Sequence, residues 1–564
     1  MTFNLKVTPL GGVGEIGALN CMVYETKDEA FIVDCGSMFP NEETLGVDLI
    51  IPDFSSLHLI KHKLKGVVFT HGHEDHVGAI PFLLQQFNLP IYATPFTAGL
   101  IEQKLEEYPL LRKPHLNIFD PGDSISVGAF KIDTVFVNHS IIDACCLVLQ
   151  TPVGAVVHLT DWKIDKTPVD GRVIDLKKFS AVGKSGVLAL FSDSTNVSEG
   201  GSTLSEREVE RQLKKICARH KGRIITTLFS SNIHRVQALA RVAKSLGRSI
   251  ALVGRSMREN TILARRLGRL SFEGVEVLDV EEMHRLKPDE VMCLVTGTQG
   301  EPRSVLSRMA CDQFKPFQIR EGDLVLFSSK VIPGNERNIF SVIDNLARRG
   351  ARVLYESVHE IHTSGHAHQD ELCEIVRRLK PKYFIPIHGQ YRHLVRHAEL
   401  AQKWGIKNTF VVEDGTPIVF EKKGARLSEA VQTGRVFVDG KGVGDVADAV
   451  LRDRKHLSET GIVICILMID RKTGEIIRGP ELISRGFIEE AGAHGHEVVP
   501  PWGGVPVQLL TEAKKVVLEA LSAFNLSALT DMVEVQEEVR IALRRLFKKK
   551  LERKPVVIPV IMEV

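Results

Sequence analysis

The chain of 564 residues exceeds what a single hydrophobic core accommodates, so two or three domains are expected. Its 72 Lys and Arg against 70 Asp and Glu leave a net charge of only +2, which excludes a uniformly basic, nucleic-acid-attracting surface. No apolar run approaches the roughly 20 residues that span a bilayer, and the N-terminus MTFNLKVTPLGG lacks a signal-peptide core. The sequence therefore predicts a cytoplasmic protein without a membrane partner.

The nine cysteines indicate the same compartment. They form no CxxC pair and lie mostly in apolar, strand-like runs such as IVICILMID (462–470). An odd number of cysteines without a disulfide framework is typical of buried thiols in a reducing environment.

Short β-rich runs that end in polar residues dominate the beginning of the chain. They are FIVDCG (31–36), GVVFTHGH (66–73), FKIDTVFVNHS (130–140) and GAVVHLTDW (154–162). Between them, VGAIPFLLQQF (77–87) has the spacing of a buried helix. Because the ends of neighbouring strands can converge on one edge of a sheet, these polar residues are candidates for a common site.

The pattern of predicted strands and helices then changes twice. Residues 206–355 alternate amphipathic helices with short apolar strands, which predicts a parallel α/β sheet. Site-like segments return in 356–436, so a first domain beginning at 1–205 is interrupted by an inserted one. A Gly-rich and charged stretch at 437–455 is predicted to be a linker, and 456–564 a small α+β domain.

The segment THGHEDHVGAI (70–80) is the sharpest chemical signal. It places three imidazoles and a carboxylate within six positions, directly after an apolar run. Residues two apart in extended backbone project to the same side, so His71 and His73 can bind one ion. Asp75 and His76, after the turn, can reach a second ion beside it. Imidazole and carboxylate ligands without thiolate favour zinc, with manganese or magnesium as substitutes.

Three further residues at predicted strand ends complete a site for two ions. Asp161 in HLTDW is the natural bridging carboxylate, because its two oxygens can serve two cations about 3.5–4 Å apart. His139 in FVNHS and His388 in YFIPIHGQ supply one more imidazole for each ion. The predicted first ion has the ligands His71, His73, His139 and Asp161, and the second has Asp75, His76, Asp161 and His388.

These motifs, in this order, resemble a known family. HxHxDH with a distant His, Asp and His is similar to the metallo-β-lactamase superfamily, and further segments narrow the resemblance to its β-CASP nucleases and to bacterial ribonuclease J. The segments are GGVGEIG (11–17), SDSTN (192–196), SNIHR (231–235), GRSM (254–257), TGTQGEP (296–302), HTSGH (362–366) and PIHGQYR (386–392). One departure is visible: Leu159 and Thr160 stand where the family usually has Thr-Gly before the bridging Asp161.

The resemblance implies an α/β fold, in which a metallo-β-lactamase αββα sandwich carries an inserted β-CASP parallel α/β domain and a small C-terminal α+β domain. It also implies a zinc-dependent ribonuclease, a 5′-to-3′ exonuclease preferring 5′-monophosphorylated RNA with additional endonuclease activity. Such an enzyme acts in mRNA decay and rRNA processing. Two divalent ions would lower the pKa of a water from 15.7 to about 7, so that hydroxide attacks the phosphodiester.

Further site residues follow from the same resemblance. His366 is the candidate proton donor, and Asp75 and His76 are catalytic through the metal. The implied substrate-binding residues are Ser231, Asn232, His234, His362, Thr363, Ser364, Gly365 and His366. Asp34, which closes FIVDCG, is expected to stand behind the metal ligands and orient a ligand imidazole, although a turn-forming Asp is the alternative. Asp193 in SDSTN matches an acidic motif of the β-CASP group and is expected in the same outer shell, although a hydroxyl-rich turn explains it nearly as well. Some relatives hold a structural calcium ion, which Asp48 and Asp445 would bind here, although two surface carboxylates need no ion to explain them.

Partners and alternatives are also implied. The substrate would be single-stranded RNA, bound at its 5′ end. The C-terminal domain would join subunits into a homodimer or homotetramer, and proteins of an RNA-decay complex would be further partners. A hydrolase of small thioesters or lactams is one alternative, although a small substrate needs neither the insertion nor HTSGH. A nuclease acting on DNA is another, and an RNA-binding scaffold without catalysis a third.

Overall fold

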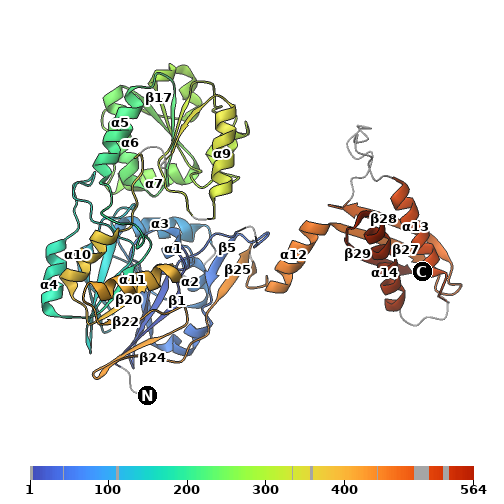
Figure 1. Cartoon of the computed structure of the whole chain (residues 1–564), viewed down its shortest axis with the longest axis horizontal. Coiled ribbons are helices and arrows are strands. Elements are labelled where there is room, and N and C mark those ends of the chain that lie inside the picture. The colour runs from blue at the N-terminus through green and yellow to red at the C-terminus, as the bar shows by residue number, and fades with distance from the viewer. Residues whose placement is uncertain are drawn as a thin grey trace. The chain divides into compact units, whose positions relative to one another are not determined.

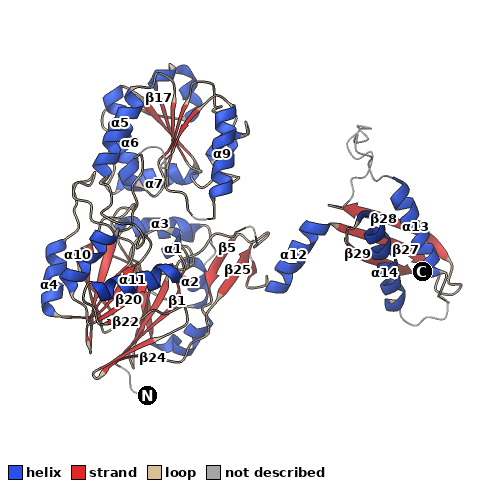
Figure 2. Cartoon of the chain, viewed as in Figure 1, coloured by secondary structure: helices blue, strands red, loops and turns tan. Residues whose placement is uncertain are grey.

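The computed structural model describes residues 4–41, 43–108, 113–332, 334–355, 360–440, 442–487, 507–524 and 532–564. The chain forms two compact units, Met1–Phe39 with Leu49–Val436 and Pro40–Asp48 with Phe437–Val564. Figures 1 and 2 show the elements of each unit. None of the helices in the described ranges combines the length and apolarity that crossing a membrane takes.

Two facing sheets form the sandwich of the first unit. The eight-stranded sheet has the order β24 (Gly424–Leu427), β23 (Ile418–Glu421), β1 (Leu5–Gly11), β3 (Cys21–Glu25), β4 (Ala30–Val33), β6 (Leu64–Val68), β7 (Ile91–Ala93) and β8 (Leu116–Ile118). The seven-stranded sheet has the order β22 (Asn408–Thr409), β20 (Tyr383–Ile387), β13 (Val187–Asp193), β12 (Gly154–Leu159), β11 (Cys145–Thr151), β10 (Phe130–Phe136) and β9 (Ser124–Val127).

The core of the sandwich lies between these sheets. In strand β10, Phe130, Ile132 and Thr134 are buried and alternate with the more exposed Lys131 and Asp133. Ile132 pairs with Leu149 of β11, and both belong to the core between the two sheets. On the outer face of the seven-stranded sheet, Phe179, Ile375 and Leu400 come from α4 (Leu176–Ser185), α10 (Gln369–Leu379) and α11 (Tyr391–Lys403). The other helices that the structure describes in the sandwich are η1 (Ser55–Lys63), α1 (Glu74–Val77), α2 (Ile80–Gln86) and α3 (Pro95–Glu106). The αββα sandwich is confirmed.

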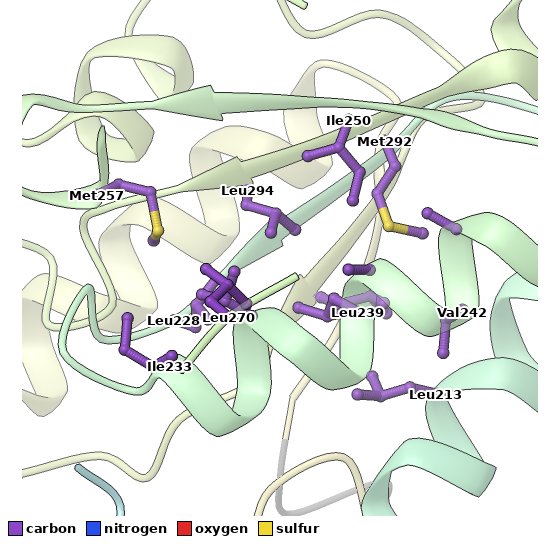
Figure 3. Close-up of a cluster of buried hydrophobic side chains, with 14 of the residues drawn as sticks. Leu213, Leu228, Ile233, Leu239, Val242, Ile250, Met257, Leu270, Met292 and Leu294 are labelled. Carbon is purple, nitrogen blue, oxygen red and sulfur yellow. The ribbon is translucent and has the colours of Figure 1, made fainter. Parts of the chain in front are cut away.

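The inserted sheet is entirely parallel, as predicted. Its order is β16 (Val277–Leu278), β15 (Ser249–Val253), β17 (Val291–Val295), β14 (Ile224–Thr227), β18 (Leu324–Phe327) and β19 (Arg352–Leu354). Helices α5 (Glu206–Ala218), α6 (Ile233–Leu246), α7 (Arg255–Arg266), α8 (Val305–Ala310) and α9 (Glu336–Arg348) accompany it. Figure 3 shows one core layer, in which Leu239 and Val242 of α6 lie under Ile250 and Met292 of the sheet.

Capping residues fix where α5 and α6 begin. The hydroxyl of Ser205 accepts the backbone N–H of Arg207, and the side chain of Asn232 accepts that of Arg235. Each satisfies a donor that a helix N-terminus otherwise leaves without a partner. Helix α6 ends at Gly247 in the left-handed conformation, with φ of 65°, which glycine adopts without strain.

The second unit contains a three-stranded sheet of order β28 (Ile476–Arg485), β27 (Ile462–Ile469) and β29 (Val556–Glu563). Helices α13 (Val507–Leu521) and α14 (Val533–Leu551) cover one face, where Val463, Cys465 and Leu467 are buried.

The stretch predicted as a linker, 437–455, differs from that expectation. It holds part of a hairpin, β25 (Arg435–Asp439) with β26 (Gly442–Val443), and most of α12 (Asp448–Thr460). Ala, Leu, Arg and Lys favour a helix even when it is exposed, and Gly440 and Gly444 lie in a turn and a bend beside β26, so a linker-like composition also suits this structure. The limits of the predicted domains stay a prediction.

Candidate metal centre

The seven predicted metal ligands converge at one edge of the sandwich. His71 and His73 lie between β6 and α1, and Asp75 and His76 lie within α1. The other three follow strands of the second sheet: His139 comes after β10, Asp161 after β12 and His388 after β20. Their ligand atoms form two groups, each with all atoms within 4.8 Å of one another, and Asp161 belongs to both.

The first group gathers around His73. The Nδ1 atom of His73 lies 3.1 Å from Nε2 of His71 and 3.1 Å from Nε2 of His139. Oδ2 of Asp161 lies 3.6 Å from Nε2 of His71 and 3.5 Å from Nε2 of His139. Three nitrogens and one carboxylate oxygen therefore lie close enough together to bind one divalent metal ion.

The second group uses the other oxygen of the shared carboxylate. Oδ1 of Asp161 lies 3.3 Å from Nε2 of His76 and 3.5 Å from Nε2 of His388. Oδ2 of Asp75 lies 3.4 Å from Nε2 of His76 and 3.2 Å from Nε2 of His388. Asp161 thus presents one oxygen to each group, the arrangement expected of a bridging ligand.

The outward-facing nitrogens of these imidazoles have partners that fix the rings. Nδ1 of His76 lies 2.8 Å from the carboxylate of Asp34, which also accepts the backbone N–H and hydroxyl of Thr70. Nδ1 of His139 lies 2.8 Å from the carbonyl oxygen of Gly365. Nδ1 of His388 lies 2.8 Å from the hydroxyl of Thr195. Ligand imidazoles in metal sites are oriented by contacts of this kind, and Asp34 makes one with the ring of His76.

The electrostatics of the centre fit divalent cations. Burial lowers the pKa of His71 and His139 well below its ordinary value, and that of His73 to about 4, so these rings are neutral and free to coordinate. Burial would raise the pKa of Asp75, but the adjacent His76 holds it well below the usual range. Within the described ranges, every ion pair of Asp75 and Asp161 is with an imidazole.

His366 stands beside this centre. Its Nδ1 lies 2.8 Å from a carboxylate oxygen of Asp193, and its Nε2 lies 3.8 Å from Oδ2 of Asp161. Burial alone would lower the pKa of His366, but Asp193 and Asp161 raise it above its ordinary value. A protonated imidazole held by a carboxylate can deliver a proton from Nε2.

The rest of the 362–366 loop is held from both sides. The hydroxyl of Thr363 donates to the carbonyl of Leu204, and the amide of Asn196 donates to the hydroxyl of Ser364. Gly365 leaves no room for a side chain, because a Cβ there would lie 2.7 Å from the ring of His139. The loop and the first ligand group are therefore in direct contact.

The predicted residues of SNIHR occupy the start of α6. Asn232 caps the helix with its side chain, whereas Ser231 is partly exposed and His234 is buried. His362, from the other loop, has a ring nitrogen, Nδ1, without a hydrogen-bond partner among the described residues. Burial, with the nearby Arg235, lowers the pKa of His362 to about 3.

Several contributors were missed from the sequence. The amide of Asn20 donates to Oδ2 of Asp75 at 3.2 Å and lies 3.1 Å from Nε2 of His76, although no motif marks it. Thr195 and Asn196 belong to SDSTN, where the hydroxyl-rich turn could have signalled them. At the departure from the family pattern, the hydroxyl of Thr160 donates to Oδ1 of Asp161 at 2.6 Å.

The calcium site at Asp48 and Asp445 stays a prediction. Oδ2 of Asp48 accepts the backbone N–H of Gly440. Within the described part of the chain, neither Asp48 nor Asp445 belongs to a group of three or more His, Cys, Asp or Glu ligand atoms.

Family models match consecutive parts of this chain. The metallo-β-lactamase superfamily matches residues 15–145, and the ribonuclease J β-CASP domain matches 221–346. The zinc-dependent metallo-hydrolase RNA specificity domain matches 350–412, and the ribonuclease J C-terminal domain matches 449–499 and 502–564.

Whole-length relatives agree with these models. Ribonuclease J of Thermus thermophilus is 38% identical over 99% of this chain and 95% of its own length. Ribonuclease J of Mycolicibacterium smegmatis is 38% identical over 99% of this chain and 97% of its own length. Ribonuclease J of Helicobacter pylori is 35% identical over 98% of this chain and 79% of its own length. The chain belongs to the ribonuclease J family. It is a metallo-β-lactamase-fold ribonuclease, a hydrolase with a divalent-metal site whose substrate is RNA.

The fold is also found in a solved structure. A crystal structure of a protein of unknown function from Enterococcus faecalis V583 matches with a TM-score of 0.52 and 16% identity, over 74% of this chain and all of that one. At this identity the match concerns the fold alone.

Proposed function

We propose that this ribonuclease binds two Zn²⁺ ions and degrades RNA from the 5′ end, preferring a 5′-monophosphate, with additional endonuclease activity. Its roles would be mRNA decay and rRNA processing in the cytoplasm. The observation that carries the proposal is the convergence of both ligand groups on Asp161, with His366 and its loop beside them. A small-molecule hydrolase needs no such loop or inserted domain.

The proposed ligands of the first ion are His71, His73, His139 and Asp161, and those of the second are Asp75, His76, Asp161 and His388. When bound, two such ions supply Lewis-acid chemistry: they acidify a water and neutralise charge on phosphate oxygens. Asp34, Thr195 and the carbonyl of Gly365 would hold the ligand rings in place. Manganese or magnesium would be weaker substitutes.

The proposed role of His366 is to protonate the leaving 3′-oxygen from Nε2, while Asp193 holds Nδ1. The hydroxyls and backbone of 362–366 would bind the scissile phosphate. The N-terminus of α6, a helix of 14 residues, offers backbone N–H groups and a positive dipole to a terminal phosphate, with Ser231 and His234 beside it. The unpartnered Nδ1 of His362 supports the same pocket.

The test uses one labelled RNA with a 5′-monophosphate, with a 5′-triphosphate and as a circle. Wild type is compared with Asp75→Ala/His76→Ala and with a matched control, His62→Ala, which removes an exposed histidine outside the centre. We expect mononucleotides to accumulate fastest from the monophosphate, slow internal cleavage of the circle, no activity in the double variant and wild-type rates in the control.

Equal rates on the monophosphate and triphosphate would contradict the 5′ preference. Intact RNA throughout, with DNA or a thioester hydrolysed instead, would show that the proposed substrate is wrong. Identical activity of wild type and the double variant would place catalysis elsewhere.

The proposed homodimer or homotetramer is supported by the second unit. Val463, Cys465 and Leu467 of β27 face the helices, so the alternate residues lie on the opposite face of the sheet. On the neighbouring β29, Ile558, Val560 and Met562 are exposed by 42%, 37% and 41%. An apolar face of this kind is typical of an association surface. Light scattering should give a multiple of 62.7 kDa, and the monomer mass at micromolar concentration would refute association.

A further inference from the structure

Four buried charged side chains meet where the chain passes between the sandwich and the inserted sheet. Glu206 is the first residue of α5, at the outgoing crossing, and Ile361 precedes the 362–366 loop, at the return. Lys163, Asp165, Glu206 and Arg235 are exposed by 1%, 2%, 3% and 0%. Charged side chains are rarely this buried unless they are paired, so their arrangement needs a reason.

Glu206 and Arg235 form the centre of this cluster. One carboxylate oxygen of Glu206 accepts from Nε of Arg235 at 3.2 Å and from Nη2 at 2.9 Å. The remaining nitrogen of Arg235, Nη1, donates to the carbonyl of Ile361 at 2.9 Å and to the hydroxyl of Ser328. One ion pair therefore ties together the outgoing crossing, the SNIHR segment of α6 and the start of the returning loop.

Lys163 and Asp165 connect the pair to the metal centre. They lie two and four positions after the bridging ligand Asp161, and the backbone N–H of Lys163 donates to the carbonyl of Asn138, next to His139. Nζ of Lys163 lies 3.7 Å from Glu206 and 3.8 Å from Asp165. It has no hydrogen-bond partner within the described residues, so its charge is balanced only by these carboxylates. Asp165 also accepts the backbone N–H of Glu206.

We infer that Lys163, Asp165, Glu206 and Arg235 form a crossover clamp, which positions the 231–235 and 361–366 segments against the metal centre. Two cations and two anions make the clamp neutral. Glu206 is its key positioning residue, because it is the one carboxylate that faces both cations. The functional consequence rests on the proposed function, in which those two segments bind the phosphates of the RNA.

The clamp has an energetic signature that a packing role lacks. Removing one member of a buried ionic group leaves an uncompensated charge, whereas removing an opposite pair restores neutrality. Glu206→Gln keeps the shape but leaves Lys163 and Arg235 against Asp165 alone. Adding Lys163→Met removes the excess cation, and the amide oxygen of Gln can still accept from Arg235. The double variant should therefore have a higher kcat/KM and a higher unfolding temperature than Glu206→Gln alone.

The experiment compares wild type, Glu206→Gln, Glu206→Gln/Lys163→Met and the matched control Glu208→Gln, which makes the same change at a solvent-accessible position of α5. Each is measured for kcat and KM on the wild type's best RNA substrate, for zinc content and for thermal unfolding. For Glu206→Gln we expect unchanged zinc content, a lower unfolding temperature and a fall in kcat/KM of about 10²-fold, the scale of a displaced binding segment. The double variant should recover at least about tenfold of that loss.

A double variant no better than Glu206→Gln in both kcat/KM and unfolding temperature would overturn the clamp, as would a Glu206→Gln variant equal to wild type. If Glu206→Gln does not fold, a folded double variant supports the charge balance and an unfolded one refutes it. Failure of the proposed function is seen separately, because wild type would then show no preference for 5′-monophosphorylated RNA, whereas the ranking of the variants is independent of that preference.

Discussion

The metal centre and the crossover clamp are both buried clusters of ionisable side chains, yet they are balanced in opposite ways. In the clamp, two cations of the chain face two carboxylates, and Arg235 and Lys163 outweigh burial to lower the pKa of Glu206 to about 2. In the metal centre, the ion pairs of Asp75 and Asp161 within the described ranges are all with imidazoles and none is with Lys or Arg. The chain itself supplies the cations of the clamp, whereas the carboxylates of the metal centre are left with imidazole partners, a set that suits bound metal cations.

We therefore expect the metal centre to bind ions and the clamp to position the segments that hold RNA. A change in the metal centre should alter metal content and chemistry, because its charge balance comes from outside the chain. A change in the clamp should leave metal content intact and alter how RNA is held. Four substitutions test this contrast.

Asp161→Ala should have the largest effect, because it removes a ligand from both groups at once. We expect zinc content to fall from two ions to fewer than one per chain and RNA cleavage to fall at least about 10³-fold, the scale of losing a principal charge stabiliser. Elemental analysis beside a cleavage assay measures both. If this variant kept the zinc content of wild type, Asp161 would not be a metal ligand.

Gly365→Ala should reduce kcat by about 10²-fold, because its Cβ would displace the ring of His139 or the 362–366 loop. Gly200→Ala is the matched control, since a Cβ there meets no atom within 4 Å. Steady-state kinetics on one RNA measures the effect. Equal kinetics for the two variants would show that the loop tolerates the side chain.

Thr160→Val tests the departure from the family pattern. The hydroxyl of Thr160 donates to Oδ1 of Asp161, the oxygen that faces the second ligand group, and so competes with an ion for its lone pairs. We expect one of two zinc ions to bind about tenfold more tightly in the variant, within the usual range for residues behind a ligand. Competition with a chelator measures the two affinities. Weaker binding would show that the hydroxyl orients the carboxylate instead.

Asp414→Asn tests a buried carboxylate for which the described residues supply no salt bridge. Burial raises the pKa of Asp414 from 3.8 to about 7, although the N–H of Val13 donates to it. Between these values the folded chain holds a proton that the unfolded chain releases, so stability falls as pH rises from about 4 to about 7. The variant should unfold a few degrees (~2 °C) above wild type at pH 8 and show no gain at pH 4. Calorimetry at pH 8 and pH 4 measures both unfolding temperatures. A gain that does not depend on pH would show that the raised pKa of Asp414 is not its cause.

The sequence predicted what depends on local spacing. The alternation of apolar residues predicted the strands of the sheets. The four candidate ligands within six positions predicted the segment around which the two ligand groups gather. The helix expected at 77–87 is interrupted, because Ala79 donates its N–H to the carbonyl of Cys35 and α1 ends before α2 begins. That tertiary hydrogen bond has no signature in the helical periodicity.

Contacts across the fold could not be predicted in this way. Asn20 reaches Asp75 over 55 positions, and Arg235 reaches Ile361 over 126. A lone Asn after a turn, or a Glu at the start of a charged helix, is more often a solvated residue. Their roles follow only once the sandwich and the inserted sheet are folded together.

The most direct test of the two-ion centre is a titration of metal-free enzyme with Zn²⁺, followed by bound zinc and by cleavage of 5′-monophosphorylated RNA. The arrangement of Asp161 between two ligand groups predicts saturation at two ions per chain, with activity appearing only as the second ion binds. Full activity with one ion, or binding that saturates at one, would contradict a centre of two ions.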